Sequence, residues 1–197
     1  MLKKLSAIFV LTIFMIILTS CSNSSSKTKT SDTKSKNSQL AKNKFSNSVD
    51  NVCLGVDKDV FIELSSSSNE STTDFPRFEK ALQGAEDEMD KTIGKLDGIE
   101  IPDEQSDDFE TFLDDLSAIR DSYPLLSEKF KELVAAMADS NSTDLEIQNK
   151  AQSDMEQLQS DIEPIIEDQT QRRNEIKKIS KRLNFDNCDF IDVSSDY

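Results

Sequence analysis

The residue types that this chain lacks limit the chemistry it can perform. It contains no histidine, and its three cysteines are Cys21, Cys53 and Cys188. Without histidine, the chain offers no Ser-His-Asp triad, no histidine-ligated zinc site and no di-iron bundle site with Glu-x-x-His ligands. Its four glycines are scattered and form no phosphate-binding loop. We therefore expect no catalytic residue, no metal site and no cofactor, and a chain that is not an enzyme.

Carboxylates are the one reactive residue type present in excess. They form runs without the spaced ligands and loop glycine of an EF-hand, and glycosidase chemistry would need a shaped pocket between two of them. We interpret these runs as solvated helix faces rather than cation or catalytic sites. The runs are Glu86, Asp87, Glu88 and Asp90; Asp103, Glu104, Asp107, Asp108 and Glu110; and Asp114 and Asp115.

Cys21 closes an N-terminal segment with the pattern of an export signal. Lys3 and Lys4 precede an apolar run over residues 7–18, which is short for a membrane-spanning helix and fits the apolar region of a signal peptide. The run ends in Leu18-Thr19-Ser20-Cys21, which resembles the lipobox of bacterial lipoproteins. The alternative is an uncleaved apolar anchor with a chance cysteine.

The lipobox resemblance implies a diacylglycerol thioether on Cys21 and cleavage before it by the lipoprotein signal peptidase. Residues 1–20 are then the signal peptide. Two acyl chains are enough for stable attachment, so the expected location is the extracytoplasmic face of the cell membrane. The membrane, reached through this lipid, is the first expected partner.

Residues 21–44 are rich in serine, lysine, threonine and asparagine, and poor in the apolar residues needed to form a core. We expect a disordered stalk there. The segment contains six lysines and one acidic residue, Asp32. This composition resembles the stalks of Gram-positive lipoproteins. The lysines either attract anionic lipid headgroups or only keep the stalk soluble.

Residues 45–197 have the opposite charge. They contain 15 Lys and Arg against 37 Asp and Glu, a formal charge of −22. Such a segment does not bind nucleic acid by neutralising phosphates. It should also be repelled by anionic headgroups and wall polymers.

Apolar residues recur at helical spacing through this acidic segment. We expect one domain over residues 45–197, an all-α antiparallel bundle of three or four helices. Gly55 weakens the first helix, Pro76 and Gly98 suit the start and end of the second, and Thr143 with Glu146 has capping-box spacing before the fourth. The expected helices run from about 47 to 64, 73 to 98, 102 to 138 with Pro124 inside, and 143 to 183 with Pro164 inside.

Two polar residues interrupt the apolar stripe of the fourth helix. Gln169 and Arg172 occupy positions between Ile165 and Ile176 that should face the core. Arg172 could pair with a carboxylate of the third or first helix, or bind an anionic ligand. The ligand interpretation predicts a cavity bordered by Ile162, Ile165, Gln169 and Arg172.

Cys53 and Cys188 lie at the two ends of the expected bundle. In an exported domain, an even pair of cysteines favours a disulfide, and two free thiols are the alternative. Together with the acidic amphipathic helices, the Ile101-Pro102-Asp103 helix start and the closing Leu183-x-Phe185-x-x-Cys188 pattern resemble small helical Gram-positive lipoproteins of unknown function. That resemblance implies a helical bundle closed by a Cys–Cys bridge, and no activity.

From the sequence we therefore expect a membrane-anchored lipoprotein whose helical body is a non-enzymatic binding module for a protein or another envelope component. The alternative is a small-ligand-binding or sensing domain at the proline-containing centre of the last two helices.

Overall fold

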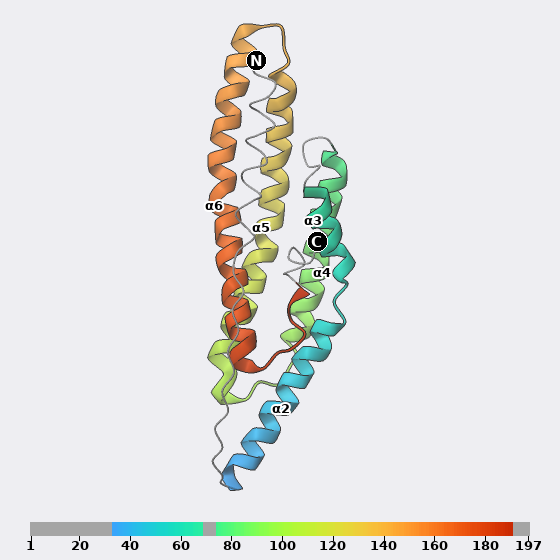
Figure 1. The fold of residues 1–197 in the computed structure, drawn as a ribbon, viewed down its shortest axis with the longest axis vertical. Helices are drawn as coiled ribbons and strands as arrows, with labels where there is room; N and C mark the ends of the chain where they lie inside the picture. The colour runs from blue at the N-terminus through green and yellow to red at the C-terminus, as the bar shows by residue number, and fades with distance from the viewer. Residues whose placement is uncertain (1–32, 69–73, 191–197) are drawn as a thin grey trace.

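The computed structural model describes residues 33–68 and 74–190, and every regular element within them is helical. This confirms the expected all-α bundle (Figure 1). The elements are α2 (Thr33–Leu54), α3 (Lys58–Ser68), α4 (Phe75–Leu96), the short 3-10 helix η3 (Asp103–Gln105), α5 (Ser106–Asp139) and α6 (Leu145–Leu183).

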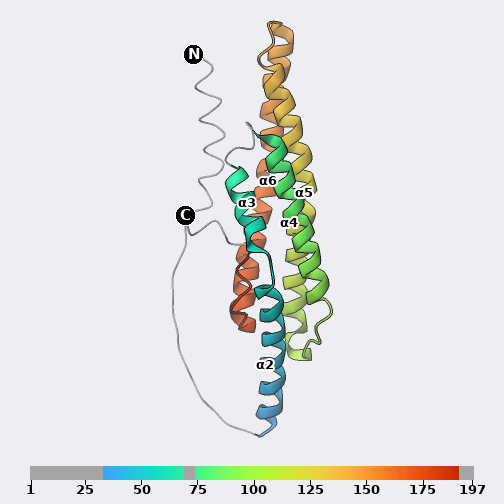
Figure 2. The same cartoon turned by 90° about the vertical axis from the view of Figure 1, so that its right-hand side faces the viewer.

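A long antiparallel hairpin of α5 and α6 forms the framework of the molecule. The α4 helix packs on α5, and α3 packs on α4. The α2 helix joins the bundle at the end opposite the turn of the hairpin, and its N-terminal part projects beyond that end (Figures 1 and 2). At the other end, the turn of the hairpin projects beyond α3 and α4 (Figure 1).

An aromatic cluster ties α2 to α5 and to the segment after α6. The ring centroids of Phe45 and Phe109 are 5.0 Å apart, and those of Phe112 and Phe185 are 5.5 Å apart. All four side chains are buried. Such pairs contribute about 0.5–1.5 kcal/mol beyond the burial of their area, so the cluster fixes where α2 sits.

The expected first helix proves to be two helices. The α2 helix ends at Leu54 and α3 begins at Lys58, with Gly55 at the break. Asp57 starts the new helix, since its Oδ1 accepts a hydrogen bond of 3.2 Å from the backbone nitrogen of Asp59. The sequence suggested a weak point at Gly55 but not a full break.

The stalk expected over residues 21–44 is too long, because α2 is helical from Thr33. Once Phe45 and Val49 are packed in the core, the helix needs no new nucleus to extend backwards, and each added residue costs little. Residues 1–32, including the expected signal peptide, Cys21 and the first part of the expected stalk, lie outside the described ranges.

Helix caps match the sequence at α4 and differ at α6. Asp74 caps α4, accepting a hydrogen bond from the backbone nitrogen of Arg77, and Pro76 lies in the first turn. At α6 the N-cap is Asp144, whose Oδ1 accepts from the nitrogen of Glu146 at 2.8 Å. The expected Thr143 capping box is therefore wrong by one residue. Aspartate is itself a favoured N-cap residue.

Candidate functional site

Gln169, expected at a ligand site, is buried in the hairpin and has a partner there. It is 7% exposed, and its amide nitrogen donates a hydrogen bond to Ser122 Oγ on α5. The Ser122 hydroxyl donates in turn to the carbonyl oxygen of Ile119, one turn earlier. A hydroxyl can donate and accept at once, so the protein's own groups fill this polar break in the core.

Arg172 makes ion pairs both across and along the hairpin. Its Nη1 lies 3.0 Å from Asp115 Oδ1 on α5, and its Nε lies 2.7 Å from Asp168 Oδ2 on α6. Burial raises the pKa of Asp115, and the Arg172 guanidinium opposes that rise. The structure thus shows the carboxylate pairing considered for Arg172. Binding of an anionic ligand there stays a prediction.

Tyr123 and Arg173 form a third polar contact between the same helices. Tyr123 is 2% exposed, and burial raises its pKa while the hydrogen bond and charge of Arg173 oppose the rise. A slip of one turn between α5 and α6 would leave these buried groups without partners, which is costly. The polar seam, as we call the set, therefore fixes the register of the hairpin. Its pairs are Asp115–Arg172, Ser122–Gln169 and Tyr123–Arg173.

A groove of about 460 Å³ lies beside Pro124, between α4 and α5. Its lining is mixed, with Lys80 and Lys131 against Glu79 and Glu128. None of the four residues expected to border a cavity lines this groove. The groove is therefore not the cavity that the sequence predicted. No feature of the sequence signals a groove between these two helices, and α5 continues through Pro124 as one helix.

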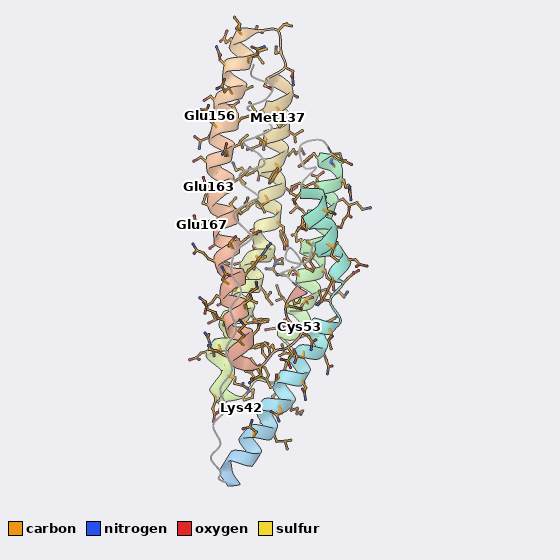
Figure 3. All side chains as sticks on the ribbon, viewed as in Figure 1. Lys42, Cys53, Met137, Glu156, Glu163 and Glu167 are labelled. Atoms are coloured by element: carbon orange, nitrogen blue, oxygen red, sulfur yellow. A yellow bond between two sulfur atoms is a disulfide. The ribbon has the colours of Figure 1, made fainter. Side chains whose placement is uncertain are left out.

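The expected disulfide is present between Cys53 and Cys188. The sulfurs are 2.00 Å apart and the Cα atoms 5.0 Å apart, across a sequence separation of 135. Cys53, labelled on α2 in Figure 3, is fully buried, and Cys188 is 5% exposed. The bridge joins the end of α2 to the segment that follows α6.

Asp50 holds the same segment and was missed in the sequence. Its Oδ1 accepts hydrogen bonds from the backbone nitrogens of Asp186 and Asn187, at 2.8 and 3.0 Å. Asp50 lies one turn before Cys53 on α2, so the carboxylate and the bridge act together. We call Asp50, Cys53 and Cys188 the terminal clamp. No local pattern marks Asp50, because its partners are main-chain groups far along the chain.

Most members of the acidic runs lie on exposed helix faces or pair with nearby cations. Asp108 Oδ1, for example, lies 2.7 Å from Arg182 Nη2. Figure 3 shows a further acidic row, Glu156, Glu163 and Glu167, along the outer side of α6, where all three are exposed. Within residues 33–68 and 74–190, no three histidine, cysteine or acidic side chains are grouped closely enough to hold a metal ion.

Glu88 is an exception to the expected solvated faces, because it is only 8% exposed. Its Oε1 accepts a hydrogen bond of 3.1 Å from the nitrogen of Asp57, and its Oε2 lies 2.8 Å from Lys91 Nζ. Burial alone would raise the pKa of Glu88. The bonds from Lys91 and Asp57 outweigh burial and lower it. This carboxylate therefore holds the break between α2 and α3.

None of the helices in the described part of the chain combines the length and apolar character needed to cross a bilayer. The lipobox cysteine, Cys21, falls outside that part. Comparisons with protein families, with curated proteins and with solved structures find no match for this chain.

Proposed function

We propose that this chain is a lipid-anchored extracytoplasmic lipoprotein whose helical body is a non-enzymatic binding module. The different roles of the three cysteines support the lipid anchor and the extracytoplasmic location. The bridge between Cys53 and Cys188 suits an oxidising compartment outside the cytoplasm. That bridge uses two of the three cysteines, and the third, Cys21, is the cysteine of the lipobox-like motif.

The anchor is tested by Cys21→Ser in cells. The wild-type chain should incorporate labelled fatty acid and sediment with membranes. The variant should lose the label and either remain as uncleaved precursor or leave the membrane. Unchanged label and an unchanged mature mass in the variant would contradict the lipoprotein assignment.

For the binding module, we assign the projecting end of the α5–α6 hairpin, residues 131–158, as the contact surface, and call it the hairpin tip. Two large apolar side chains, Leu145 and Ile147, are 73% and 43% exposed there. They lie two positions apart at the start of α6, so they point to different sides of the helix. The tip extends past α3 and α4, which leaves it open to a partner on several sides (Figure 1). A helical end with exposed apolar side chains can enter a groove of another protein or pack on its helix.

Site-specific photo-cross-linking in living cells tests this surface. A photo-reactive residue at position 145 should capture a protein, and the same residue at Leu125, which is 52% exposed on α5 below the tip, should not. Ile147→Glu should reduce capture at 145. A lipidated chain lacking residues 45–197 gives the background. Equal capture at both positions, or capture that Ile147→Glu leaves unchanged, would exclude the tip as the binding surface.

A small-ligand or sensing function at the hairpin centre is the second candidate. Asp115 Oδ2 and Arg173 Nε are buried there without a hydrogen-bond partner, which leaves polar capacity beside the seam. A ligand would have to compete with Asp115 for Arg172. A metabolite extract that raises the unfolding temperature of the wild type, but not of Arg172→Met, would support this candidate over the binding module.

A further inference from the structure

The α2 helix presents one face to the bundle and the opposite face to solvent. Phe45, Val49 and Cys53 face the bundle and are each no more than 2% exposed. The other face, which we call the outer face of α2, is exposed along its length. It consists of Leu40, Lys44, Asn47, Asn51 and Leu54.

Two of the exposed large apolar residues in the described ranges lie at the ends of this face. Leu40 is 69% exposed and Leu54 is 60% exposed, on a helix of 22 residues. Between them stand only Lys44 and two asparagines. At a bilayer interface, exposed leucines can enter the headgroup–acyl boundary, and a neighbouring lysine can meet anionic headgroups.

Two other charged residues of α2, Asp50 and Lys42, have partners in the bundle. Asp50, the one acidic residue of the helix, accepts two backbone hydrogen bonds in the terminal clamp. Lys42 pairs with Glu104 of η3, Nζ to Oε2, at 2.5 Å. The outer face therefore carries positive charge without an acidic residue of its own, on a molecule whose body is strongly acidic.

We propose that the outer face of α2 docks on the anionic phospholipid surface beside the lipid anchor. The leucines enter the interface, and Lys44 meets the headgroups. This inference rests on the proposed lipidation of Cys21, which places α2 a short stretch of chain from the bilayer. The hairpin tip lies at the other end of the molecule from the start of α2 (Figure 1), so docking leaves the tip free.

Lipid is favoured over an anionic wall polymer because the face combines its charge with two exposed leucines. Lysines alone would be enough to bind a polymer of phosphates, and an exposed Leu40 would add nothing to that binding. Attraction to anionic lipid is also strongest within a Debye length of the surface, where a helix starting at Thr33 can reach it.

The test uses the intact, lipidated protein on vesicles of phosphatidylcholine alone or mixed with phosphatidylglycerol. A photo-reactive residue is placed at position 40 and, as the matched control, at position 125. We expect lipid adducts at 40 on the phosphatidylglycerol vesicles, far fewer on phosphatidylcholine alone, and few at 125 on either.

A charge variant measures the contribution of Lys44. Lys44→Gln should lower the ratio of docked to undocked protein about five-fold, since a lysine near an anionic surface contributes about 1 kcal/mol to association. Lys150→Gln removes the same charge from the hairpin tip and should leave the adducts at 40 unchanged. Leu40→Ser should also weaken docking, with position 54 as the reporter.

Protein that is attached to vesicles but gives no excess of adducts at 40 over 125, or the same adducts on both lipid mixtures, would overturn the docking proposal alone. Protein that never attaches to vesicles would instead contradict lipidation. In cells, adducts from position 40 to a wall polymer rather than to lipid would also overturn it.

Discussion

At the scale of single residues, the pair of Asp115 and Arg172 decides whether the hairpin centre is structural. Asp115 is 8% exposed, and its Oδ1 meets the guanidinium while Oδ2 has no hydrogen-bond partner. Taking away the cation would leave a buried carboxylate with no compensation. Loss of the cation would then lower the free energy of unfolding, whether or not any ligand is present.

We predict that Arg172→Ala destabilises the fold by about 1–3 kcal/mol at neutral pH, measured by urea unfolding. Without Arg172, burial should raise the folded pKa of Asp115 further above its unfolded value of 3.8. The folded state then binds the proton at higher pH than the unfolded state. The penalty is therefore full above the folded pKa and fades as the pH falls towards 3.8.

Lys150→Ala is the control for this prediction, because it breaks the exposed Lys150–Asp154 pair, 2.7 Å long, in the same helix. Exposed pairs contribute at most about 1 kcal/mol, so this variant should change stability little. An Arg172→Ala penalty no larger than that of the control would show that the pair does not support the hairpin.

The sequence identified Gln169 and Arg172 as misplaced polar residues, because they interrupt a regular apolar stripe. It could not identify Ser122 or Asp115 as their partners. That step requires the register of two helices separated by a turn, and neither residue has a local pattern. Cys53 and Cys188 were easier to pair, because they are the two cysteines left in the domain once Cys21 is assigned to the lipobox-like motif.

At the scale of elements, the break between α2 and α3 separates what periodicity can predict from what it cannot. Val52, Val56 and Val60 keep one helical spacing across the break, and Val56 is buried in the connection. The apolar pattern therefore continues although the hydrogen-bonded helix does not. The hydrogen bond from Asp57 to Glu88, a residue of α4, supports the break, and no window of local sequence contains it.

We predict that Glu88→Ala costs about 1–3 kcal/mol and that Glu88→Gln costs less, because the amide still accepts from the nitrogen of Asp57. The lowered pKa of Glu88 gives the opposite pH dependence to that of Asp115. Its stabilisation is present above the unfolded value of 4.5 and is lost as the pH falls through the folded pKa below it.

Hydrogen exchange of α3 amides, together with urea unfolding across this pH range, measures the effect of Glu88. If the Glu88→Ala variant exchanges faster than the wild type in α3 but not in α6, the loss of stability lies at the break between α2 and α3. If alanine and glutamine were equally costly, the charge rather than the hydrogen bond to Asp57 would be responsible.

At the scale of the whole molecule, the terminal clamp closes the fold. The α2 helix contacts the rest of the bundle through a short buried face. Its attachment to the bundle therefore depends on the aromatic cluster, Asp50 and the disulfide bridge. The bundle class was predictable from composition and periodicity, since scarce glycine and proline and repeated apolar stripes allow little else. The helical start of α2 was not predictable, because Leu40 and Ala41 are the only apolar residues between Thr33 and Phe45 and form no repeating pattern.

We predict that Cys53→Ala with Cys188→Ala destabilises the protein by about 5 kcal/mol, the chain-entropy value for a separation of 135 residues. Calorimetry of the variant against the oxidised wild type measures the loss. Mass spectrometry after alkylation under denaturing conditions gives the companion result. Cys53 and Cys188 should be labelled only after reduction, and labelling of either without a reductant would refute the bridge.

The terminal clamp also determines how the molecule would bear tension. A pull between the proposed anchor at Cys21 and the segment after Cys188 reaches Cys53 along α2 and crosses directly to Cys188 through a covalent bond. Residues 54–187 lie on a closed loop beside that covalent path and are not stretched by it. The body would stay folded while the chain around it is stretched, and only a pull applied to the hairpin itself would reach the packing of α5 against α6.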